Sequence, residues 1–204
     1  MTRSTLALSA AVAALVAVAV LRASEARAAS PKYYFKIQPV KAGPEVDADL
    51  KTYTGEALKA ELASRPEWAS DIGPTGASGP GTDRTALVAE LKKRNLRGFD
   101  VSARIENLKQ EVKDPKPGAR NKRLAVEVQL TVFGTTIPDA KLAFSGDGQS
   151  SSEAEVSERR LGADTADTTK DVIKDAIKQA VDQAVFKLSI GKSGPMNEKH
   201  KKKK

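Results

Sequence analysis

The chain has 204 residues, no cysteine and a single histidine, and 29% of its residues are charged. The absence of thiols excludes disulfide bonds, thiol catalysis and thiolate metal sites. Of the formal net charge of +8, residues 1–28 contribute +2 and residues 192–204 contribute +5, which leaves +1 for residues 29–191. The basic character therefore belongs to the two ends of the chain, and it does not indicate a basic binding face in between.

The first 28 residues have the three parts of a secretory signal peptide. Arg3 supplies the positive charge, residues 6–21 are apolar, and Ala26-Arg27-Ala28 has the small-x-small pattern of a cleavage site. We expect cleavage between Ala28 and Ala29, which gives a periplasmic or secreted protein with no remaining transmembrane span. The alternative is an uncleaved anchor, although a spanning helix takes about 20 apolar residues.

The first half of the mature chain alternates strand and helix patterns. Residues 33–40 (YYFKIQPV) predict a strand, and Asp47 or Asp49 is placed to cap a helix that reaches about residue 64. A short strand at 68–72 comes next. The glycines and prolines of 73–81 indicate a flexible loop, because no Gly-Lys-Ser/Thr follows to make it a phosphate loop.

The pattern then becomes a helix followed by several strands. Asp83 caps a second helix that ends near Asn95, a residue suited to stop it, as is Gly98. Alternation predicts strands at 99–106, 124–133 and 140–144, the last two forming a hairpin. We expect 113–123 and 134–138 to be turns and 145–155 to be a polar loop.

The last predicted element is a helix from about residue 164 to residue 188. Its apolar positions fall on one stripe, which must be buried against a sheet: Val172, Ile173, Ala176, Ile177, Ala180, Val181, Ala184, Val185 and Leu188. The predicted fold is a single α+β domain over residues 29–191. It has a mostly antiparallel sheet of about four to five strands packed by three helices.

Few residues offer the elements of an active site. The lone His200 lies in a terminal lysine run, where it cannot be held against a second catalytic group. Four aspartates lie at helical spacing, but interleaved lysines favour a solvated surface over a metal site: Asp164, Asp167, Asp171 and Asp175. The serines of 145–152 have neither a Gly-x-Ser-x-Gly motif nor a base. We therefore predict a non-enzymatic protein that needs no metal or cofactor.

Two groups of residues remain as candidates for contact with partners. Trp68, Tyr33 and Tyr34 are either core residues, the more common case, or interface anchors. The C-terminal lysines form an anion-binding candidate for acidic lipid or polymer, because like charges at a chain end stay solvated: Lys199, Lys201, Lys202, Lys203 and Lys204. The alternative is that residues 192–204 are only a solubilising disordered tail. The export signal argues against nucleic acid as a partner.

The order of elements resembles the periplasmic domain of outer-membrane activators of penicillin-binding proteins (the LpoB type) and, more loosely, curli-secretion-like envelope proteins. The similar segments are YYFKIQPV, LKAELAS, LVAELKKRNLRGFDVSARI, AVEVQLTVFGTTIPDAKLAFSGDGQSSS and DVIKDAIKQAVDQAVFKL, within residues 33–188. The resemblance implies an α+β domain that works by contact with an envelope protein. The chain departs from it in lacking a lipid-attachment cysteine and in its Gly/Pro-rich 71–84 loop. Binding of anionic lipid or polymer through the tail is the alternative function.

Overall fold

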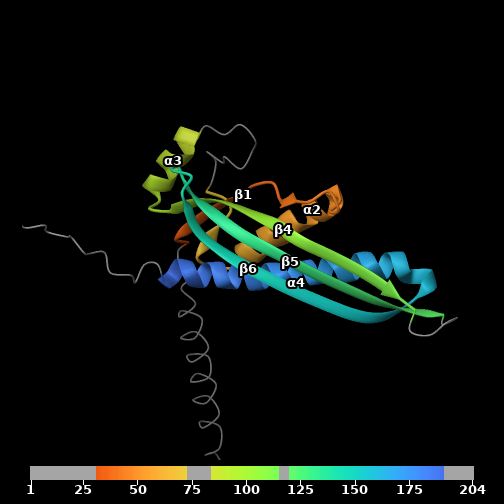
Figure 1. Cartoon of the computed structure of the whole chain (residues 1–204). Coiled ribbons are helices and arrows are strands. Elements are labelled where there is room, and N and C mark those ends of the chain that lie inside the picture. The colour runs from red at the N-terminus through yellow and green to blue at the C-terminus, as the bar shows by residue number, and fades with distance from the viewer. Residues whose placement is uncertain (1–30, 73–83, 115–119, 191–204) are drawn as a thin grey trace, which may run out of the picture. The chain divides into compact units, whose positions relative to one another are not determined.

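The computed structural model describes residues 31–72, 84–114 and 120–190 (Figure 1). The leader, the 73–81 loop, the Asp83 cap and the lysine tail with His200 lie outside these residues. The helices are α2 (Ala48–Ala63), α3 (Arg84–Lys93) and α4 (Leu161–Ile190), with a short 3-10 turn η1 (Glu158–Arg160) before α4. In the described part of the chain, no helix is long and apolar enough to span a membrane.

Six strands form one sheet, with the order β3-β1-β4-β5-β6 and β2 paired to β4. The strands are β1 (Tyr33–Ile37), β2 (Lys41–Ala42), β3 (Trp68–Ala69), β4 (Arg97–Lys113), β5 (Asn121–Ile137) and β6 (Leu142–Ser157). The β4-β5-β6 meander is antiparallel, whereas β1 pairs in parallel with both β3 and β4 and β2 pairs in parallel with β4. The α+β class is confirmed, but the sheet is mixed and the prediction of a mostly antiparallel sheet is wrong. A helical crossover between two strands lets both run in the same direction and pair in parallel. No local pattern in the sequence predicts these parallel pairings.

The three long strands extend into segments that the sequence predicts to be turns or loops. β4 continues to Lys113 and β5 starts at Asn121, so most of the expected 113–123 turn is strand or lies outside the described residues. β5 also runs through 134–137, and β6 contains the whole expected loop at 145–155. Backbone hydrogen bonds to a long neighbouring strand stabilise these polar segments despite their weak intrinsic preference.

Helix α2 begins and helix α3 ends where the sequence predicts. Asp47 is the cap of α2, and its carboxylate accepts a hydrogen bond from the Leu50 N–H at 2.7 Å. After α3, Asn95 has φ of 55°. The N–H of Leu96 donates to the carbonyl of Leu91 at 2.9 Å, which closes the helix in a Schellman arrangement.

Helix α4 covers one face of the sheet, called here the inner face. The predicted stripe is confirmed, because its residues are buried or, at Val185, packed against the core. The helix extends beyond the predicted 164–188 at both ends. It packs mainly on β5 and β6, with α2 beside it. The inward residues of β5 (Leu124, Val126, Val128, Leu130 and Val132) complete this core.

Helix α3 lies on the opposite face, at one end of the sheet. It forms a small second core with Tyr34, Ile72, Leu87 and Leu91, onto which Leu96 and Ile137 pack. Tyr33 and Phe35 point the other way, into the main core. Trp68 is 5% exposed and Tyr34 is 1% exposed. All three aromatic candidates, Tyr33 included, are thus core residues rather than interface anchors.

Candidate functional site

The β4-β5-β6 meander presents an outer face that the helices of the described residues leave open beyond α3 (Figure 1). Successive strand residues point to opposite sides, so residues that alternate with the buried row of β5 point to this face. On β4, Gln110 bonds to Thr169 of α4 at 2.8 Å and therefore points inward. We call this surface the open face. It comprises Arg104, Glu106, Asn107, Lys109, Glu111, Lys113, Arg123, Ala125, Glu127, Gln129, Thr131, Phe133, Ser145, Asp147, Gln149, Ser151, Glu153 and Glu155.

Charge is distributed unevenly across the open face. The β4 side carries Arg104, Lys109 and Lys113 together with two carboxylates: Glu106, 3.9 Å from Arg104, and Glu111, which lies between the two lysines. The β6 side carries the three acidic residues Asp147, Glu153 and Glu155. Between them, β5 presents mainly neutral side chains. The face therefore changes from mixed charge on the β4 side to acidic on the β6 side, which suits a partner with basic residues opposite β6.

Cross-strand contacts hold these side chains in place. Arg123 of β5 forms an ion pair with Glu153 of β6 and donates from Nη2 to its Oε2 at 2.8 Å. Gln149 Nε2 donates to Glu127 at 3.2 Å, and Thr131 donates to Asp147 at 3.0 Å. Exposed pairs of this kind each contribute little to stability. They do fix the pattern of charge that a partner meets.

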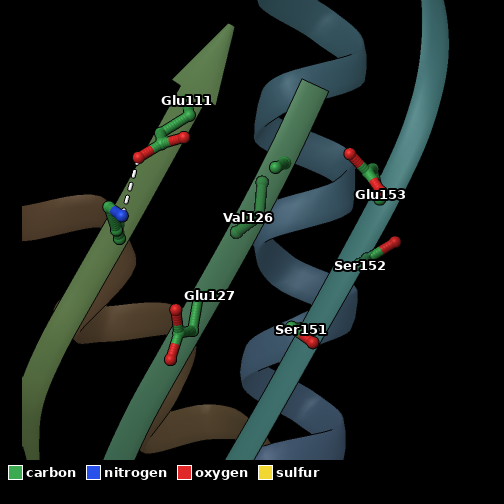
Figure 2. Close-up of a pocket in the computed structure, with 8 residues that line it drawn as sticks. Glu111, Val126, Glu127, Ser151, Ser152 and Glu153 are labelled. Atoms are coloured by element: carbon green, nitrogen blue, oxygen red, sulfur yellow. Dashed lines mark ion pairs between the residues drawn. The ribbon is translucent and has the colours of Figure 1, made fainter. Parts of the chain in front are cut away.

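A shallow hollow of about 270 Å³ lies near the end of the open face that is farther from α3 (Figure 2). Its floor is low because Ala125 and Ser151 have small side chains on adjacent strands. Lys109, Glu111, Glu127 and Glu153 stand around it, each from a strand of the meander, and α4 lies behind the sheet. The hollow is suited to receiving a polar side chain from a partner.

Glu111 has the most strongly shifted pKa among the groups of this surface. Hydrogen bonds from Lys109 and then Lys113, at 2.7 and 2.6 Å, lower its pKa from the ordinary 4.5 to about 2. A lowered carboxylate pKa means that these contacts stabilise the fold fully above pH 4.5 and are lost as the pH falls toward 2.

We therefore expect the Glu111 carboxyl carbon to titrate near pH 2 when followed by NMR. Lys113→Ala removes one of the two donors and should move that midpoint upward, toward 4.5. A wild-type midpoint near 4.5 for Glu111 would show that the lysines do not hold it in solution.

The other candidates from the sequence do not gather into a site. Asp164 forms an ion pair with Arg160 at 3.1 Å, so it participates in a local helix contact. Among the residues that the structure describes, no three His, Cys, Asp or Glu side chains lie close enough together to hold a metal ion. The serines of 145–152 are strand residues, in a segment that the sequence predicts to be a polar loop. The alternating pattern of β5 predicts the residues of the open face from the sequence. It does not predict that this face is left uncovered by the helices.

Together these features define an α+β protein with one helix-covered and one largely open sheet face. No protein-family model and no curated protein sequence matches the chain.

Three solved structures align with the chain at low similarity. A DUF330 protein from Xanthomonas campestris aligns with a TM-score of 0.48 and 7% identity, over 81% of this chain and 91% of its own. A candidate lipoprotein from Caulobacter crescentus aligns with a TM-score of 0.41 and 9% identity, over 79% and 92%. The LpoB C-terminal domain from Salmonella enterica aligns with a TM-score of 0.28 and 12% identity, over 64% and 90%. These similarities are too distant to assign a function, which must instead be inferred from the residues of this chain.

Proposed function

We propose that this is an exported, non-enzymatic protein of the cell envelope that binds a protein partner through its open face. The observation that carries the proposal is the open face itself, a surface built on rigid strands. It combines both signs of charge with half-buried Phe133, Thr131 and Ala125. Mixed polar and apolar surface on a rigid support is typical of interfaces between separately folded proteins.

The geometry also favours a broad contact over a small-molecule site. Small-molecule pockets are concave and mainly apolar and bury most of their ligand. The hollow at Ala125 is instead open and walled by charged side chains (Figure 2). In this proposal the predicted leader directs the protein to the periplasm or the cell exterior.

Photocrosslinking tests the proposal directly. A benzoylphenylalanine residue in place of Gln129, at the centre of the open face, should form a light-dependent adduct with one envelope protein in intact cells. The matched control carries the same residue in place of the exposed Ser64, at the end of α2 on the other side of the sheet. Adduct formation at residue 64 but not at residue 129 would contradict the proposal.

A variant that ends at Ser193 separates this function from adsorption through the lysine tail. If the open face is the binding surface, the adduct at residue 129 persists without the tail. If the tail provides the binding, the adduct disappears with the truncation, because charge-based adsorption depends on the lysines and is screened by salt.

A further inference from the structure

The edge strand β6 forms a second surface, distinct from the open face. It is the last strand in the order β3-β1-β4-β5-β6, so one side of its backbone has no strand partner in the described residues. The backbone N–H of Asp147 shows which side that is, because it donates to the side chain of Gln183 on α4 at 2.7 Å. Residues two apart in a strand direct their N–H and C=O groups the same way. Gln149, Ser151 and Glu153 therefore present these groups along the same free edge.

Helix α4 follows this edge in the opposite direction. A Cβ on Gly148 would lie 1.9 Å from the carbonyl oxygen of Ala176, and one on Gly146 would lie 2.0 Å from that of Ala180. Earlier residues of β6 therefore lie beside later residues of α4. At about 3.3 Å per strand residue and 1.5 Å per helix residue, the start of β6 comes level with the last turn of α4.

Exposed apolar side chains occur where these two ends meet. Leu142 is 67% exposed, Phe186 is 64% exposed and Ile190 is 50% exposed. Phe186 and Ile190 are one helical turn apart, on the flank of α4 that also carries Gln183. A single exposed large apolar residue is ordinary, but Phe186 and Ile190 lie together at one end of this edge, and Leu142 lies at the same level on β6.

We infer that the free edge of β6 binds an extended segment of a partner protein in which basic and apolar residues alternate. Such a segment adds a strand to the sheet, with main-chain hydrogen bonds to Asp147, Gln149 and Ser151 once the Gln183 amide moves aside. Where the segment reaches the start of β6, its side chains on one face pack against Phe186 and Ile190, which are about four to five strand residues from Asp147 along the edge. Those on the other face lie beside the acidic residues of β6.

The charge of the edge favours this occupant over a second copy of the chain, because two copies of β6 bring two acidic edges together. In the antiparallel register centred on Ser151, for example, Asp147 would lie opposite Glu155. Like charges directly opposite each other destabilise a strand pair. Lysine or arginine at the same positions of a partner strand would instead complement Asp147, Glu153 and Glu155.

The probe for this site is a labelled nonapeptide, Thr-Lys-Val-Lys-Val-Lys-Val-Lys-Thr, with binding to the full chain measured by fluorescence anisotropy. Gln149→Pro removes one outward N–H but no hydrogen bond to β5, since proline is tolerated where the N–H of an edge strand faces away from the sheet. We expect binding to weaken about tenfold, the effect of losing one or two main-chain hydrogen bonds. Gln149→Ala keeps the N–H and loses the same side chain, so it should bind like the wild type.

Two further measurements complete the test. Phe186→Ser with Ile190→Ser, both exposed positions, should also weaken binding about tenfold without changing the thermal midpoint by more than a few degrees. A peptide of the same sequence N-methylated at every amide, which cannot donate a main-chain hydrogen bond from either edge, should not bind. Equal binding of the methylated peptide would show a purely electrostatic contact and overturn the inference. So would a dimer in sedimentation that Gln149→Pro dissociates, because it would assign the edge to a second copy. The open-face proposal stands or falls separately, since its crosslink at residue 129 does not use this edge.

Discussion

Gly148→Ala is expected to destabilise the protein by about 2–3 kcal/mol, although it adds a single methyl group. The added Cβ would lie 1.9 Å from the Ala176 carbonyl oxygen and 2.8 Å from its carbonyl carbon. These are backbone atoms of α4, so no side chain can rotate to make room. The helix must move away from β6, and the stripe that includes Ala176 and Ala180 loses packing along its length.

The same substitution at Gly162 is the matched control. Gly162 lies in the first turn of α4, and a Cβ there would meet nothing within 4 Å. Alanine is the better helix former, so Gly162→Ala should stabilise the protein by about 0.5–1 kcal/mol. Chemical denaturation followed by the fluorescence of the single tryptophan gives both values. If Gly148→Ala and Gly162→Ala changed the free energy of unfolding by the same amount and in the same direction, α4 would not lie against β6.

These glycines also explain why the sequence predicts a loop where the structure has a strand. The segment 145–152 is composed of Ser, Gly, Asp and Gln, residues that are rare in strands and frequent in turns. Its inward positions are small because the backbone of α4 passes within contact distance of Gly146 and Gly148. The composition thus reflects a helix some 30 residues later in the chain, and a local pattern cannot show that.

Other features of the fold are set locally and are correctly predicted. The stripe of α4 repeats at helical spacing, Asp47 precedes the first turn of α2, and Asn95 tolerates positive φ. The parallel pairing of β1 with β3 and β4 is not local, because it joins residues 33–37 to residues 68–69 and 97–101. Strand alternation likewise identifies the polar row of β5. Whether a helix covers that row depends on where α2, α3 and α4 lie.

Trp68→Ala is expected to cost about 3–5 kcal/mol, the largest effect of any single substitution proposed for this chain. Trp68 belongs to β3, a strand of only two residues, and its ring lies among four other aromatic rings. The centroids of Tyr33, Phe99, Phe144 and Phe35 are 5.0, 5.7, 5.8 and 6.1 Å away. These residues come from β1, β4 and β6, so the indole joins strands that are far apart in the sequence.

Trp68→Phe separates the packing of the ring from its polar group. The buried indole Nε1 has no hydrogen-bond partner among the described residues. Phenylalanine removes that unpaired N–H, which offsets part of the lost contact area. We expect Trp68→Phe to cost less than half as much as Trp68→Ala in thermal unfolding followed by circular dichroism. If both variants unfold like the wild type, Trp68 does not join β1, β4 and β6 into one core, and the arrangement of the sheet at that edge is wrong.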